Sequence, residues 1–305
     1  MLAAFLTVCL WSCSAIASAR TARWLGAVAA NRWRMVLAGG VLGGLWLVCG
    51  GDPGPAVWWF LLSGVIGLGL GDLCMFAAYE RQGARLTSLM THCLAVPVAV
   101  AVEWVWLGHG LGWLELGLCL AIPAVVAVAL SPGVHLVADP AARRWGIWFG
   151  IGAGIGYGLG GVIARKGYAV AAAAGQPLDG FGGAATAGFV RTLGGIAFVF
   201  LLQRFAVRML RVGHGPGTGH ERSWRRGLPW LLFTASVGPG IGMVTYQWAL
   251  AQGQAGPVHA VLCLSPIMVM PLAWLIDGDR PTPLAIVAGV LAAAGAAGVA
   301  LLHHG

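Results

Sequence analysis

Two glycine-rich stretches decide how this chain folds: Gly67-Leu-Gly-Leu-Gly71 and Gly238-Pro-Gly-Ile-Gly242. Each stretch lies in an apolar segment that runs through a short polar turn into a second apolar segment. The second segment carries a proline near its middle, Pro97 in the first copy and Pro266 in the second. The two copies form a diverged internal repeat, with one copy in each half of the chain.

The composition is that of a membrane protein. The 305 residues are 59% hydrophobic and 9% charged, with a mean hydropathy of +0.83, whereas a soluble domain carries about 25% charged residues. A membrane-spanning helix needs about 20 mostly apolar residues. Ten such stretches are predicted, at 2–19, 29–50, 57–78, 86–107, 113–131, 145–164, 183–203, 229–250, 257–276 and 283–302. They lack the alternation of a barrel strand, so the sequence predicts an all-α membrane protein.

The predicted spans divide into two halves at the polar loop that ends near residue 140. Residues 1–140 form the first five-helix repeat, and residues 141–305 form the second. Because each repeat has an odd number of spans, the two repeats must have opposite orientations in the membrane. Inverted repeats are typical of secondary transporters, and we expect the two halves to share one bundle.

The arginines predict how the chain is oriented. They gather in the first, third, fifth, seventh and ninth loops between the predicted spans. The positive-inside rule places these loops in the cytoplasm and both termini outside. The net charge of +8 therefore indicates topology and not a nucleic-acid partner. The expected location is the plasma (inner) membrane of a bacterium, crossed several times.

Three polar residues inside predicted spans are candidates for coupling or gating: Asp72, His92 and Arg191. A carboxylate in hydrocarbon usually faces a cavity, an ion pair or a proton path. Asp72 therefore suits proton coupling, or it lies near the interface and pairs with a loop arginine such as Arg81. His92 can titrate near neutral pH or simply hydrogen-bond within the bundle. Arg191 and its counterpart Arg34 can each bind an anionic group, snorkel or hold a structural ion pair. A functional or gating role is favoured for Arg191, and Arg34 is interpreted as a topology anchor.

Four further residues are candidates for contacting a solute: Trp11, Tyr157, Tyr246 and Gln247. Their side chains supply aromatic surface and hydrogen-bonding groups inside apolar spans. The alternative for each is ordinary helix packing.

Prolines and glycines predict how the spans bend and approach one another. Pro97 and Pro266 each free a backbone carbonyl and permit a kink, which predicts paired kinked helices around a central cavity. Gly152, Gly156 and Gly160 follow the small-xxx-small spacing that lets two helices approach closely.

Several short motifs match a known family. They are Trp11-Ser12, Gly71-Asp72, Tyr79-Glu-Arg-Gln-Gly83 with Leu94-Ala-Val-Pro97, Tyr246-Gln-Trp-Ala-Leu-Ala-Gln-Gly253 with Leu264-Ser-Pro266, and Leu275-Ile-Asp-Gly-Asp279-Arg-Pro-Thr. On these residues the chain resembles the drug/metabolite transporter superfamily, specifically its ten-helix EamA-type members. The resemblance covers nearly the whole chain and implies a transporter fold.

The chain departs from that family in two places. Where the family usually has a Gly-Glu pair, the first half has Gly108-His-Gly110 and the second has Gly278-Asp279. Familiar members also place both termini in the cytoplasm, which is the reverse of the orientation that the arginines predict.

The expected function is secondary active transport of a small organic metabolite or drug by alternating access. Export is the expected direction, and protons are the candidate coupling ion. The expected partners are the solute and the lipid bilayer, with no cofactor, metal ion or nucleic acid. A passive channel or lipid scramblase on the same bundle is an alternative that would conduct with Asp72 neutralised. An intramembrane enzyme is less favoured, because the sequence has no Gly-x-Ser-x-Gly or His-Glu-x-x-His motif.

Overall fold

The computed structural model describes residues 1–130, 140–201, 223–277 and 283–302, which form helices and no strand. Residues 131–139 of the loop before the predicted repeat boundary, most of the polar stretch 204–228 and the segment 278–282 lie outside the described residues.

Eight helical segments in the described part of the chain are long and apolar enough to cross a membrane. They are Leu2–Leu25, Ala27–Cys49, Gly54–Ala84, Leu86–Leu107, Ala142–Ala173, Gly180–Leu201, Trp224–Gln252 and Ala255–Leu272. Two shorter apolar helices, Trp113–Ala127 and Ile286–Leu302, accompany them. The predicted all-α, multi-pass membrane architecture is confirmed, while the count of ten spans stays a prediction.

In the first half of the chain, the third membrane segment is built from several short helices, and α4 (Asp72–Val102) contains a sharp turn. Its elements are α1 (Leu2–Leu25), α2 (Ala27–Cys49), η1 (Gly54–Ala56), α3 (Val57–Gly64), η2 (Val65–Gly71), α4 (Asp72–Val102), η3 (Glu103–Leu107) and α5 (Trp113–Leu130). Inside α4 the backbone leaves helical geometry at Gly83, where φ is 75°. Glycine adopts this left-handed conformation without steric cost, so α4 can reverse direction there and serve two membrane segments.

The second half has a similar composite segment. Its elements are α6 (Pro140–Ala173), α7 (Gly180–Leu201), α9 (Trp224–Ala235), η5 (Ser236–Gly242), α10 (Met243–Gln252), α11 (Ala255–Leu262), α12 (Ser265–Asp277) and α13 (Pro283–Leu302). The glycine-rich stretches that open the two sequence repeats are both π-helical, as η2 and η5. Single π-helical turns inside α-helices are frequent at functional sites.

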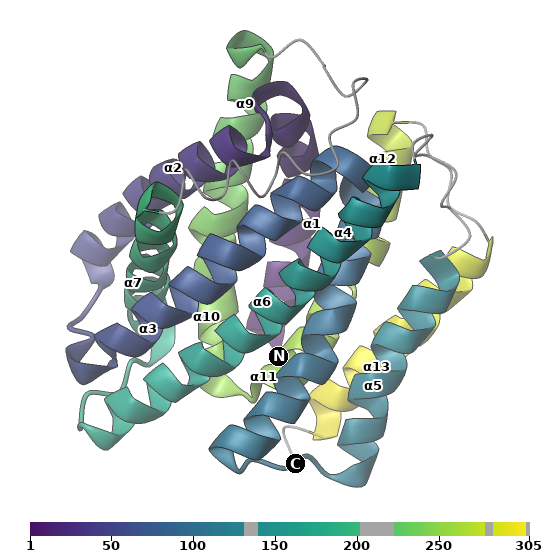
Figure 1. The fold of residues 1–305 in the computed structure, drawn as a ribbon. Coiled ribbons are helices and arrows are strands. Elements are labelled where there is room, and N and C mark those ends of the chain that lie inside the picture. Colours follow the sequence, from purple (N-terminus) through teal and green to yellow (C-terminus); the bar gives the residue numbers. More distant parts are fainter. Residues whose placement is uncertain (131–139, 202–222, 278–282, 303–305) are drawn as a thin grey trace.

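Helices from the two halves of the sequence pack against each other throughout the bundle. Helix α2 lies beside α7 at one edge, and α5 lies beside α13 at the opposite edge (Figure 1). Helix α1 contacts α9, η5, α10 and α12, whereas α6 contacts α4 and η2. The centre of the bundle is therefore built from both halves.

Glycines bring α6 and η2 into backbone contact. A Cβ atom added to Gly156 would lie 2.8 Å from the Cα atom of Gly71, and one added to Gly160 would lie 3.0 Å from that of Gly67. The close helix approach expected from the small-xxx-small spacing is thus present. Asp72 begins α4 directly after this contact, so its position is fixed by η2 packing on α6.

Candidate functional site

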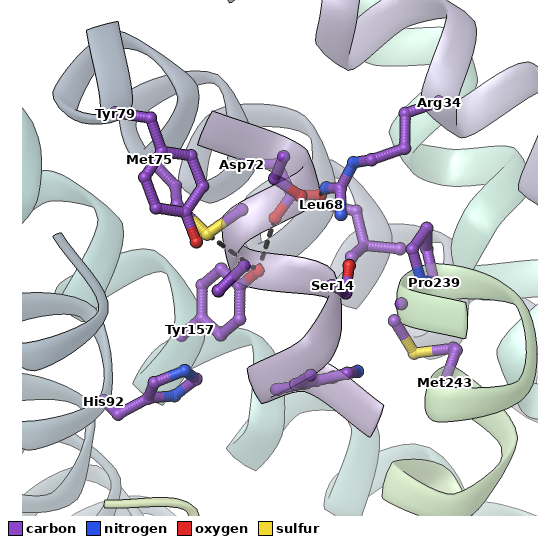
Figure 2. A pocket seen from close by; sticks show the side chains of 14 residues that line it. Ser14, Arg34, Leu68, Asp72, Met75, Tyr79, His92, Tyr157, Pro239 and Met243 are labelled. Carbon is purple, nitrogen blue, oxygen red and sulfur yellow. Dashed lines mark hydrogen bonds and ion pairs between the residues drawn. The ribbon is translucent and has the colours of Figure 1, made fainter. Parts of the chain in front are cut away.

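A narrow cavity lies in the centre of the bundle, between elements of both halves (Figure 2). Its lining residues are Trp11, Ser14, Ala15, Ser18, Arg34, Leu68, Asp72, Met75, Tyr79, His92, Tyr157, Gly238, Pro239 and Met243. The cavity volume is about 30 Å³, which is room for a few water molecules at most. An organic solute would need a wider conformation of the same site.

Asp72 is the polar centre of this cavity. Its side chain is fully buried, and its Oδ1 atom accepts a hydrogen bond of 2.5 Å from the Tyr157 hydroxyl. Its Oδ2 atom forms an ion pair with Nη2 of Arg34. Figure 2 shows Arg34 and Tyr157 reaching the carboxylate from two sides. A buried charge is tolerated when it is paired and hydrogen-bonded in this way.

The ion pair corrects the interpretation of Arg34 as a topology anchor. Arg34 is 4% exposed, and its guanidinium lies 4.7 Å from the centre of the Phe76 ring. Asp72 pairs with this buried residue of α2 and not with a loop arginine. The sequence left a structural ion pair open for Arg34 but did not indicate its partner, because the two residues lie on different helices.

Aromatic rings form the wall of the cavity around Trp11. The Trp11 ring centre lies 5.9 Å from those of both Tyr157 and His92, and 5.0 Å from that of Tyr246. The structure thus brings Trp11, Tyr157, Asp72 and His92 together at one cavity. Their roles in solute contact and coupling stay predictions.

Arg191, Tyr246 and Gln247 are not among the residues that line the cavity, although the Tyr246 ring lies against Trp11. Arg191 Nη1 donates a hydrogen bond of 3.2 Å to Oε1 of Gln247, and the guanidinium lies 5.2 Å from the Tyr246 ring centre. The Tyr246 hydroxyl is 3.1 Å from Nε2 of His259. These four residues form a second buried polar group, which we call the Arg191 cluster.

Comparison with known proteins places this arrangement in a family. The model of the EamA-like transporter family matches residues 1–131 and 144–301. The chain belongs to the EamA-like transporter family. That family is part of the drug/metabolite transporter superfamily, so the resemblance of the sequence motifs is confirmed. It is a family of membrane transporters.

Solved structures support the fold of this EamA-like chain. One of them, described only as a crystal structure of a protein, is 17% identical, with a TM-score of 0.69. The similarity covers 100% of this chain and 98% of that chain, and at this identity it shows the fold alone. No curated protein is similar enough to match.

The two matched prolines of this EamA-like protein have different surroundings. Helix α4 continues through Pro97, and the Pro97 side chain is exposed. By contrast, α11 ends at Leu262 and α12 begins at Ser265, so the helix is interrupted directly before the buried Pro266. Their equivalence as paired kinks around a cavity stays a prediction.

Two serines of α1 belong to the site and were not singled out from the sequence. The hydroxyls of Ser14 and Ser18 each lie 2.7 Å from Oγ1 of Thr234 on α9. All three residues are buried. The signal was present, because these serines face one side of an apolar helix at a spacing of four residues.

Glu103, at the start of η3, is 2% exposed. Its Oε2 atom accepts hydrogen bonds of 2.8 Å from the Ala255 amide and 3.2 Å from the Gly256 amide, at the start of α11. Its Oε1 atom is 3.7 Å from Nε of Arg165 on α6. We call this connection between the two halves the Glu103 latch.

Proposed function

We propose that this EamA-like protein is a secondary active transporter that exports a small organic metabolite or drug across the plasma membrane. The observation that carries the proposal is Asp72, which is buried in the wall of a central cavity and bound by Arg34 and Tyr157. An ionisable residue inside a membrane protein indicates an ion or substrate path by default. The cavity also has aromatic and hydroxyl groups for a solute.

Alternating access follows from ten spans arranged as inverted repeats over residues 1–140 and 141–305. Three features support it: η2 and η5 are π-helical at matching places in the repeats, α1 and α6 each pack on the opposite half, and α6 meets η2 through glycines. Interfaces made of small residues let one helix slide on another with little side-chain rearrangement. The two halves would rock about the Asp72 cavity.

Proton coupling is assigned to Asp72. A proton arriving at its carboxylate removes the negative charge that holds Arg34 and Tyr157. The released guanidinium and hydroxyl then turn toward the solute or toward water, which favours a different conformation. Loss of the proton on the other side restores the ion pair. His92, which also lines the cavity, is proposed to pass the proton, and Trp11 and Tyr157 to contact the solute.

The orientation follows from the arginine-rich loops, which we place in the cytoplasm, with both termini outside. The cavity extends along α1 from Trp11 to Ser18, toward the end of α1 that carries Arg20 and Arg23. The Glu103 latch lies at the other end of the bundle. In this proposal the described conformation is closed toward the outside.

Metabolite profiling of the medium tests the proposal. Cells overexpress the wild type, Asp72→Asn or Asp52→Asn, and a fourth culture carries no transporter. Asp52 is the matched control, because it is an exposed carboxylate that binds the Gly54 amide. A solute class that accumulates with the wild type and Asp52→Asn, but not with Asp72→Asn at equal membrane abundance, supports the proposal.

Two results would contradict it. Equal accumulation with wild type and Asp72→Asn would remove Asp72 from coupling. Flux through Asp72→Asn in proteoliposomes without any proton gradient would favour the passive channel or scramblase.

A further inference from the structure

The Arg191 cluster contains a buried positive charge that forms no ion pair with a described residue. Arg191 is 1% exposed, and Tyr246, Gln247 and His259 are each 0% exposed. Asp72 pairs with Arg34 and Glu103 lies beside Arg165, so the ion pairs of these two buried carboxylates do not include Arg191. A buried charge without a counter-ion is costly even in a protein interior.

The cluster also has unused hydrogen-bonding groups. The Nε atom of Arg191, Nε2 of Gln247 and Nδ1 of His259 are buried and have no hydrogen-bond partner. The first two are donors whatever the protonation state, and His259 can donate from Nδ1 in one tautomer. A group of buried donors around a positive charge has the chemistry of an anion site.

Glycines make room for the guanidinium. A Cβ atom at Gly67 would lie 2.5 Å from Arg191 Nη2, and one at Gly160 would lie 3.1 Å from it. A Cβ atom at Gly161 would lie 2.6 Å from Nε2 of His259. The guanidinium and the His259 ring therefore lie directly against glycine backbone, and a larger residue at any of these positions would displace them.

Tyr246 connects the Arg191 cluster to the wall of the central cavity. Its ring centre is 5.0 Å from that of Trp11, which lines the cavity, and 5.2 Å from the Arg191 guanidinium. Tyr246 is on α10, directly after η5. Movement of η5 in the transport cycle would shift this ring and open a path from the cavity to Arg191.

We propose that the transported solute is an organic anion whose charged group pairs with Arg191 while its apolar body lies against Trp11 and Tyr157. This inference rests on the proposed transport function and names its substrate class. The solute then supplies the counter-ion that Arg191 lacks, and an uncharged analogue of the same shape would not.

Binding to the purified full-length protein in lipid nanodiscs tests the inference without a transport assay. The midpoint temperature of thermal unfolding is measured at increasing concentrations of an acid or of its uncharged amide. The four acids are acetate, benzoate, phenylacetate and indole-3-acetate, and each is compared with its own amide. Sodium chloride keeps the ionic strength constant. We expect at least one acid to bind at least about tenfold more tightly than its amide, the scale of a charge-assisted hydrogen bond.

Three variants locate the effect. Arg191→Met should lose the preference for the acid, whereas Arg191→Lys should keep it with weaker binding. Lys166→Gln removes a positive charge on α6 outside the cluster and should bind as the wild type does. The ligand-free Arg191→Met protein should be at least as thermally stable as wild type, because the substitution removes an unbalanced buried charge.

The inference is overturned if no acid binds more tightly than its amide, or if Arg191→Met keeps the preference. A lower midpoint of Arg191→Met with unchanged acid binding would make Arg191 a packing residue. Proteoliposome flux then separates the two proposals. An acid that binds at Arg191 without being moved refutes transport but not the anion site, while flux of uncharged or cationic solutes alone refutes the anion site but not transport.

Discussion

The Tyr157 hydroxyl, on α6 of the second half, donates a 2.5 Å hydrogen bond to Asp72, on α4 of the first half. Arg34 binds the other oxygen of the same carboxylate. Any movement between the two halves therefore changes the surroundings of Asp72, which links the charge state of one residue to the conformation of the bundle.

Tyr157→Phe should weaken transport and stability together. It removes one hydrogen bond to a buried carboxylate, which is worth about 1.5–3 kcal/mol. Tyr168→Phe is the matched control, because the Tyr168 hydroxyl donates a 3.0 Å hydrogen bond to the Gln247 carbonyl, also from α6 but away from the cavity. Solute flux and thermal unfolding of both variants measure the effect. Equal flux in the two variants would show that the Tyr157 hydroxyl has no part in transport.

Arg34 and Asp72 should show strong coupling in a double-mutant cycle. Arg34→Met alone leaves an unpaired buried carboxylate, and breaking a buried pair in this way costs about 3–5 kcal/mol. The double variant Arg34→Met/Asp72→Asn removes both charges and should be more stable than Arg34→Met alone. Unfolding in nanodiscs gives the interaction free energy. Additive effects of the two substitutions would argue against the ion pair.

Gly156→Ala should destabilise the bundle by about 1–3 kcal/mol, the usual range for overpacking. Its new methyl group would meet the Cα atom of Gly71, which cannot move aside as a side chain can. Gly40→Ala is the control, since a Cβ atom there meets nothing within 4 Å and alanine is the better helix former. Thermal unfolding compares the two. If both variants are as stable as wild type, α6 and η2 are not in contact in the membrane.

Glu103→Gln should open the end of the bundle that the Glu103 latch closes. The neutral amide binds the α11 amides more weakly and no longer attracts Arg165. Cys263 is a suitable reporter, because it is fully buried and lies near His92, whose carbonyl accepts a 3.4 Å hydrogen bond from its thiol. With the other cysteines replaced by serine, a membrane-impermeant thiol reagent should label Cys263 faster in Glu103→Gln than in Asp52→Asn.

Labelling of Cys263 at the same slow rate in both proteins would show that Glu103 caps α11 without controlling access. The replaced cysteines are expected to tolerate serine, because the described ones form no disulfide.

The sequence predicted several residues that line the cavity, but it did not predict which residues bind them. Asp72, Tyr157, His92 and Trp11 stood out because each is a polar or aromatic residue inside an apolar span, and the structure gathers them at one cavity. Arg34 was placed at the membrane surface because a basic residue near the end of a span usually anchors topology.

In the Arg191 cluster, too, the sequence identified residues but not their contacts. The sequence marked Arg191, Tyr246 and Gln247 as unusual, but it assigned the last two to the cavity lining. The rotation of α10 turns Gln247 toward Arg191 on α7 and the Tyr246 hydroxyl toward His259 on α11. A one-residue change in the length of the π-helical η5 would rotate that face by roughly 100°, the turn per residue of an α-helix.

The sequence by itself determined the all-α, multi-pass class, the family and the approximate positions of the apolar helices. Continuous apolar runs and glycine spacing are local properties, and a bilayer accepts long apolar segments as helices. Only the tertiary structure decided that Arg34 neutralises Asp72, that Arg191 has no counter-ion among the described residues, and that Glu103 joins two halves of the chain. The physical reason is that pairing depends on how each helix is rotated and which distant helix lies beside it, and the long-range packing of the bundle fixes both.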